Sequence, residues 1–152
     1  MTAESIVSNS ACLIALERIE QLNLLPQVYP SIWIPQAVKQ EIGFLTDWLQ
    51  VQTVQNQALV STLRTQVGAG ESEAIALALE IKNVPVLLDD KKARRIAEQL
   101  NLQVTGTVGL LLKAKKKGVI PAIRPILDAL EAVDFRISSN LRTRALELAE
   151  EA

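Results

Sequence analysis

The stretch Glu71–Thr105, ESEAIALALEIKNVPVLLDDKKARRIAEQLNLQVT, decides the fold class of this chain of 152 residues. Its segments 71–82 and 91–100 both carry Ala and aliphatic residues at helical spacing. Between them, segment 84–88 is almost wholly apolar, as expected for a strand that is covered on both faces. A short strand at 102–105 follows. This order of strand, helix and strand predicts a right-handed crossover between parallel strands.

The rest of the chain continues the alternation of strands and helices. Ser10 is the expected N-cap of the first helix, Gly68-Ala69-Gly70 is expected to interrupt the chain, and Gly118 is expected to close a helix. We therefore predict an α/β fold, a three-layer α/β/α arrangement with a parallel sheet of about five strands. It forms one domain over residues 1–152, with a helix-rich part from about 119. Further strands are expected at 5–8, 31–34 and 49–54, and further helices at 11–20, 35–42, 56–66, 108–117, from 125 through 130, and from 138 or 139 through 148.

The composition excludes several kinds of chemistry. The chain has no histidine, which excludes Ser-His-Asp and Cys-His catalysis and argues against a zinc site. Cys12 is the only cysteine, so no internal disulfide can form, and it is most simply a buried apolar residue. Residues 1–10 do not resemble a secretory signal, and no apolar run is long enough to span a membrane. We expect a cytoplasmic protein without a membrane segment.

Oxygen-bearing side chains occur where a parallel α/β fold would gather them. Ligands in such folds bind beyond the carboxyl ends of the strands, and several acids also lie near helix ends. Mg²⁺ and Mn²⁺ prefer oxygen ligands, so the joint pattern favours a divalent-cation site. The residues concerned are Asn9, Glu41, Glu71, Glu73, Asp89, Asp90 and Thr107.

Each of these residues alone also has a purely structural interpretation. Glu71 and Glu73 would be favourable beside the dipole of a helix that starts there. Asp89 or Asp90 would cap the following helix, and Thr107 would be another N-cap. A lone glutamate late in a helix is usually solvated, and a lone asparagine after a strand is usually a turn residue. The metal interpretation therefore depends on all of them meeting at one place.

Basic residues form two clusters that could contact a phosphate backbone. Their alternative interpretation is a solvated helix face. No aromatic residues alternate with the cations, so base stacking is not expected to drive binding. The clusters are Lys91, Lys92, Arg94 and Arg95, and Lys113, Lys115, Lys116 and Lys117, with Arg124, Arg142 and Arg144 as further candidates.

Several stretches together resemble the PIN-like family, in particular a prokaryotic subgroup of nucleic-acid-binding proteins. They are IVSNSACLIALERIEQLNLL, IWIPQAVKQEI, GAGESEAIALALE, VPVLLDDKKARRIAEQLNLQVTGTVGLLLKAKKKGVIP and FRISSNLRTRALELA. The resemblance implies a parallel sheet of strand order 3-2-1-4-5 and a ribonuclease site that uses Mg²⁺ or Mn²⁺. Many relatives are toxins of toxin–antitoxin pairs, often homodimers that a small antitoxin protein holds silent.

The resemblance also implies roles for individual residues. Glu41, Glu71, Glu73 and Asp90 are the implied catalytic acids, with either Glu71 or Glu73 matching the family's acid in the central helix. Relatives carry Asp directly after the first strand, whereas this chain has Asn9, which brings no negative charge. The implied metal ligands are Asn9, Glu41, Glu73, Asp89 and Asp90, the accessory residues are Ser10 and Thr107, and the RNA-binding residues are Lys91, Lys92, Arg94, Arg95, Lys113 and Lys116.

Three hypotheses about function follow from these observations. The first is a metal-dependent endoribonuclease of PIN type, acting as a toxin, with activity weakened by Asn9. The second is a catalytically degenerate PIN-like module that binds RNA or a protein. The third is a structural subunit that binds its partner through the C-terminal helices.

Overall fold

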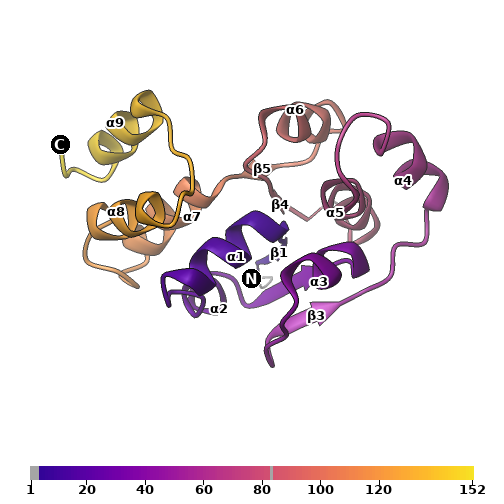
Figure 1. Cartoon of the computed structure of the whole chain (residues 1–152), viewed down its shortest axis with the longest axis horizontal. Helices are drawn as coiled ribbons and strands as arrows, with labels where there is room; N and C mark the ends of the chain where they lie inside the picture. Colours follow the sequence, from indigo (N-terminus) through magenta and orange to yellow (C-terminus); the bar gives the residue numbers. More distant parts are fainter. Residues whose placement is uncertain (1–3, 83) are drawn as a thin grey trace.

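A five-stranded parallel sheet with the strand order β3-β2-β1-β4-β5 forms the centre of the molecule (Figure 1). The computed structural model describes residues 4–82 and 84–152. Residues 1–3 lie outside the described residues. The predictions for segment 1–10 and for the start of the domain can therefore be compared with the structure only from Glu4 onward. The predicted fold class and strand order are confirmed. The strands are β1 (Ser5–Val7), β2 (Ser31–Ile34), β3 (Leu49–Val51), β4 (Val86–Leu87) and β5 (Val104–Thr105).

Nine helices in the described part of the chain connect and cover these strands. None of them is long and apolar enough to cross a bilayer. The helices are α1 (Ser10–Arg18), α2 (Leu24–Val28), α3 (Gln36–Ile42), α4 (Gln57–Leu63), α5 (Ala69–Glu80), α6 (Lys91–Gln99), α7 (Thr107–Lys116), α8 (Arg124–Ala132) and α9 (Ser139–Leu148).

Successive residues of a strand point to opposite faces of the sheet, so each strand contributes side chains to both faces. Both faces are covered by helices and are buried. Ile6 of β1 belongs to one apolar core and Val7 belongs to the other. In the same way Leu87 faces the first core, while Val86 and Leu88 face the second. This alternation separates the three layers.

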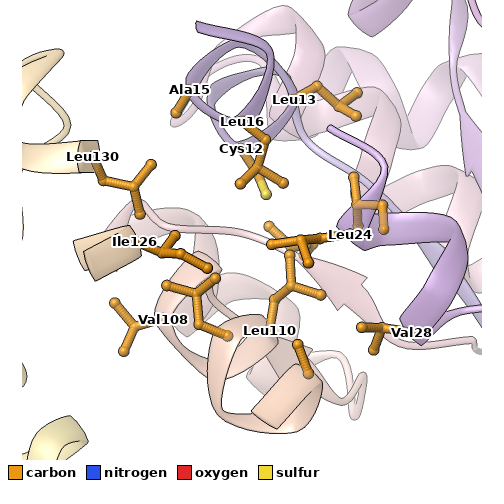
Figure 2. Close-up of a cluster of buried hydrophobic side chains, with 14 of the residues drawn as sticks. Cys12, Leu13, Ala15, Leu16, Leu24, Val28, Val108, Leu110, Ile126 and Leu130 are labelled. Carbon is orange, nitrogen blue, oxygen red and sulfur yellow. The ribbon is translucent and has the colours of Figure 1, made fainter. Parts of the chain in front are cut away.

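The first core is formed by the sheet together with the helices α1, α2, α3, α7, α8 and α9. Figure 2 shows Leu16 of α1, Leu24 of α2, Leu110 of α7 and Leu130 of α8 in this cluster. The second core lies under α4, α5 and α6, and α5 contributes Ala74 through Ala78, all with no exposed surface. The small alanines allow α5 to approach the sheet closely.

Some local predictions from the sequence are wrong. Ser10 does not cap α1, because the side chain of Asn9 accepts a hydrogen bond from the backbone of Cys12 at 3.1 Å and is itself the N-cap. The Gly68-Ala69-Gly70 stretch does not interrupt the chain before the helix, since α5 begins at Ala69 with Gly68 as its N-cap. The helix α2 was not predicted, because five residues are too few to show a helical period.

Candidate functional site

The carboxyl ends of β1, β4 and β5 lie side by side in the sheet, and the N-termini of α1, α6 and α7 follow them directly. Helix N-termini carry partial positive charge and free N–H groups, so they favour carboxylates. Most of the oxygen-bearing residues singled out from the sequence lie at such helix starts. This edge of the sheet is therefore the candidate site.

A hydrogen-bond network joins the ends of three strands at this edge. Asp89 accepts from the backbone N–H and the hydroxyl of Thr107, both at 2.8 Å, and from the Nδ2 of Asn9 at 3.3 Å. Asn9 and Thr107 are 5% and 0% exposed, so the network is sheltered from water. Thr107 is the first residue of α7 and Gly106 is its N-cap, so the suggestion that Thr107 caps the helix is wrong. Asp89 ties β1, β4 and β5 together.

Gly106 allows these groups to approach one another. A Cβ added there would lie 2.7 Å from a guanidinium nitrogen of Arg94 and 3.2 Å from Oδ1 of Asp89. Arg94 in turn donates to the backbone carbonyl of Leu88 at 2.8 Å. Any larger residue at Gly106 would therefore displace the Arg94 or Asp89 side chain.

Asp90, next to Asp89, is the N-cap of α6. This was one of the two roles that the sequence suggested for it. Its Oδ2 accepts from the backbone N–H of Ala93 at 2.9 Å. The structure gives no other hydrogen bond to the Asp90 carboxylate within the described residues, so its second oxygen is available to a ligand.

Glu41 comes from α3 and reaches across to two other helices. The hydroxyl of Ser10, at the start of α1, donates to its carboxylate. Its Cδ would lie 2.9 Å from a Cβ added at Gly70, in the first turn of α5. The absence of a side chain at Gly70 thus leaves the space that the Glu41 carboxylate occupies.

Glu71 lies in the first turn of α5 and is electrostatically coupled to this group of acids. Partial burial, together with the charges of Asp90 and Glu41, raises the pKa of its carboxyl group, although a hydrogen bond of 3.2 Å from the Gly68 backbone N–H lowers it. Asp90 and Glu41 are thus close enough to Glu71 for their charges to disfavour its ionised form.

Glu73, the second candidate from α5, makes a different contact. Its Oε1 accepts from the backbone N–H of Ala37 at 3.1 Å, in the first turn of α3. Because α3 has no side-chain cap from its N-cap residue, Pro35, this contact supplies the missing acceptor. Glu73 thus binds a helix terminus on the side of α5 that faces α3.

The donors at this edge suit a hard divalent cation in kind, but they are not gathered around one point. Carboxylate oxygens are the preferred ligands of Mg²⁺ and Mn²⁺, and the repulsion within the acidic group Glu41, Glu71 and Asp90 would be relieved by a cation. However, within residues 4–82 and 84–152, no three or more Asp, Glu or Cys side chains are positioned to hold a metal ion. Asn9 and Asp89 already use their side-chain oxygens in hydrogen bonds.

The basic residues predicted to bind nucleic acid divide into two sets. Lys91, Arg94 and Lys113 line a cavity that includes Asp89, and the other three of them, Lys92, Arg95 and Lys116, are exposed and do not line it. The cavity has two further cations, Arg136 and Arg144. Arg144 was a secondary candidate from the sequence. Arg136 was missed because it stands alone in the sequence, with no neighbouring positive charge to mark it.

A model of one protein family, described as a PIN domain, matches residues 5–151. The chain belongs to the PIN-domain family. None of the curated proteins compared with the chain matches it. The match supports a nuclease-like domain that binds nucleic acid, as the resemblance implied.

Membership of the PIN family does not assign roles to individual residues of this chain. The roles of Glu41, Glu71, Glu73, Asp89, Asp90 and the basic residues remain predictions. In the structure Glu73 contacts α3, and the charges of Asp90 and Glu41 contribute to the raised pKa of Glu71.

Proposed function

We propose that this PIN domain is a divalent-cation-dependent endoribonuclease whose working acids are Glu41, Glu71 and Asp90. The observation that supports this proposal best is the position of the Glu41 carboxylate against Gly70, in the first turn of α5 beside Glu71. The charges of Asp90 and Glu41 also add to burial in raising the pKa of Glu71. Each of the three carboxylates accepts a structural hydrogen bond, but those contacts do not require the repulsion that Asp90 and Glu41 exert on Glu71. A bound cation would offset that repulsion.

The residues of the chain have separable tasks in this proposal. Because no three acidic side chains of residues 4–82 and 84–152 surround one point, Glu41, Glu71 and Asp90 would have to turn toward one another to hold the cation, for which Mg²⁺ and Mn²⁺ are the candidates. When bound, such an ion neutralises charge on a scissile phosphate and lowers the pKa of a water molecule. Asp89 fixes the strand ends through Thr107 and Asn9, so it positions the site instead of binding the ion.

The experiment compares cleavage of a single-stranded RNA in Mn²⁺ by the wild type and by Asp90→Asn. Asn keeps the oxygen that caps α6 but removes the charge, so the fold should be retained. We expect cleavage to fall at least a hundredfold. Asp47→Asn is the matched control, because Asp47 is an exposed aspartate two residues before β3, at the amino end of that strand. Equal cleavage by wild type and Asp90→Asn would refute the assignment.

A second candidate function is RNA binding without cleavage. It is favoured by Asn9, whose amide occupies the position of a usual carboxylate and donates to Asp89. Salt-dependent RNA binding with no turnover in Mg²⁺ or Mn²⁺ would support this alternative. The ribonuclease proposal can be extended to a toxin role, in which a small antitoxin protein would inhibit the enzyme. Growth arrest on expression, reversed by the product of a neighbouring gene, would test this role.

A further inference from the structure

A cavity of about 610 Å³ lies beside the acidic group, between the edge of the sheet and α9. Its volume is within the range of roughly 300–1,000 Å³ typical of sites for small ligands. Residues of β5, α6, α7 and α9 line it, and Figure 1 shows how these elements surround this side of the molecule. Asp89 and Gly106 belong to its lining, so the cavity is continuous with the candidate site.

The border of the cavity is strongly cationic. Lys91, Arg94, Lys113, Arg136 and Arg144 line it, and Asp89 is its one carboxylate among the described residues. This imbalance favours an anionic ligand.

Three of these cations have no partner among the residues that the structure describes. Lys113 pairs with Glu4 and lies 4.5 Å above the ring of Tyr29, and Arg94 donates to a backbone carbonyl. By contrast, Lys91, Arg136 and Arg144 make no ion pair or side-chain hydrogen bond with the part of the chain that the structure describes. They are therefore available to phosphate groups.

The walls between the cations are aliphatic. Val108 and Leu112 of α7 line the cavity, as do Leu141 and Leu148 of α9. Leu141 and Leu148 are 45% and 61% exposed, whereas most leucines of the described residues are buried or partly buried. The cavity thus combines an apolar wall with a cationic border, as a ligand with apolar faces and repeated negative charges would require.

We propose that this cavity binds one or two nucleotides of a single-stranded RNA beside the acidic group. The proposal rests on the ribonuclease function and names the position of its substrate. The phosphates would contact Lys91, Arg136 and Arg144, and the sugar or base would lie on the leucines of α9. The position of the cavity favours RNA over an acidic protein segment, because its lining residues Asp89 and Lys91 flank Asp90 in the chain, so a strand bound there would lie next to one of the proposed acids.

The test measures binding of a short fluorescein-labelled oligouridine in EDTA, so that it does not depend on cleavage. The variant is Arg136→Ala/Arg144→Ala, which removes two exposed side chains with no internal partner. Each phosphate contact with single-stranded RNA contributes about 0.7 to the slope of log K against log salt, so the slope should fall by about 1.4. At about 0.1 M salt the affinity should fall tenfold or more.

The matched control is Arg95→Ala/Lys116→Ala, which removes the same charge from exposed positions that do not line the cavity. The proposal expects this control to bind almost as the wild type does. Equal losses in the two variants, or a loss only in the control, would overturn it. If RNA binds the wild type and the Arg136/Arg144 variant equally, the cavity proposal fails although the ribonuclease function survives. Lost cleavage in Asp90→Asn is a separate measurement.

The alternative occupant is an acidic amphipathic protein segment, and the same variants distinguish it. A short peptide of alternating Glu and Leu should bind weakly if the cavity serves RNA. Tight binding of this peptide that is lost in Arg136→Ala/Arg144→Ala, with RNA affinity unchanged, would overturn the proposal and assign the cavity to a protein.

A chemical footprint tests the position directly. Cys12 is free and has no exposed surface, and burial raises the pKa of its thiol, so it reacts slowly. Leu148→Cys therefore introduces the one readily accessible thiol of the described residues. Oligouridine should slow its alkylation at least fivefold in EDTA. Alkylation at the same rate with saturating RNA would contradict the proposal.

Discussion

The Nδ2 of Asn9 donates to the Oδ2 of Asp89 at 3.3 Å, which joins the end of β1 to the end of β4. The Oδ1 of Asn9 accepts from the backbone of Cys12, so both ends of the amide are used. A carboxylate at this position would keep the cap but would face Asp89 without a donor. The amide therefore stabilises the strand ends in the absence of any cation.

The first prediction concerns Asn9→Asp. Two nearly buried carboxylates would then face each other, so the free energy of unfolding should fall by about 1–3 kcal/mol in EDTA. Mn²⁺ should restore much of the loss, since a cation between the two carboxylates removes their repulsion. The rise in melting temperature from EDTA to Mn²⁺ should therefore be larger for Asn9→Asp than for the wild type, whose cation would bind only at Glu41, Glu71 and Asp90. Thermal unfolding of both proteins under both conditions measures these effects.

An exchange of the two side chains provides the control for this prediction. Asn9→Asp/Asp89→Asn restores one amide and one carboxylate, and the amide oxygen introduced at position 89 can still accept from Thr107. The double variant should therefore be more stable in EDTA than Asn9→Asp alone. Additive losses in the double variant would show that the contact between the two residues does not carry the effect.

The second prediction separates Glu71 from Glu73. Glu71→Gln keeps the acceptor for the Gly68 backbone N–H but removes a charge that Asp90 and Glu41 repel. The variant should be as stable as the wild type or more stable at neutral pH, because a raised pKa means that ionised Glu71 opposes folding there. Its cleavage of RNA and any Mn²⁺-induced rise in melting temperature should be lost.

Glu73 should show the opposite pattern. Glu73→Ala leaves the backbone N–H of Ala37 without its acceptor, so we expect a loss of about 1 kcal/mol in stability. Glu73→Gln keeps an acceptor and should retain both stability and cleavage. If Glu73→Gln abolishes cleavage while Glu71→Gln does not, the assignment of the two residues must be exchanged.

The sequence predicts the layers of this fold well because the relevant signals are local. The apolar run of segment 84–88 and the helical period of 91–100 are each visible within a few consecutive residues. Strand lengths are less accessible: the strand expected at 49–54 ends at Val51, because pairing with β2 decides where the ladder stops. The helix α2 is too short to show a period.

The candidate site could be predicted only in part, since residue type does not reveal which way a side chain turns. Glu71 and Glu73 are two residues apart on one helix, and the sequence offered no basis for choosing between them. The structure separates them by what each one meets: the charge of Asp90 helps to raise the pKa of Glu71, whereas Glu73 accepts a hydrogen bond from the backbone of Ala37. Arg136 gave no signal because its neighbours in the cavity are distant in sequence.

The third prediction concerns Gly70→Ala. A Cβ at this position would collide with the Glu41 carboxylate, which is the end of a flexible, exposed side chain and can swing away. Stability should change by less than about 1 kcal/mol, since Ala also favours the helix over Gly. Cleavage should fall at least tenfold because Glu41 loses its position. Gly70→Ala/Glu41→Ala should be no less active than Glu41→Ala alone, and a further loss would show that Gly70 acts by another route.

The last prediction uses the pH dependence of Glu151, which fixes the chain end beside α9. Its carboxylate accepts from the backbone N–H groups of Ile123 and Arg124, at 2.8 and 3.1 Å, and pairs with Lys115 at 2.9 Å. The backbone hydrogen bond from Ile123, followed by the bond from Lys115, lowers the pKa of Glu151 to about 2.

Since this pKa is lower in the folded state, Glu151 stabilises the fold fully above its unfolded value of 4.5, and the contribution is lost as the pH falls toward about 2. Glu151→Gln should therefore be about 1–2 kcal/mol less stable than the wild type at neutral pH, and the difference should vanish near pH 2. Urea unfolding across this range measures it, with the exposed neighbour Glu150→Gln as control. A difference between wild type and Glu151→Gln that stays constant from pH 6 to pH 2 would mean that the charge of Glu151 contributes nothing to holding the chain end.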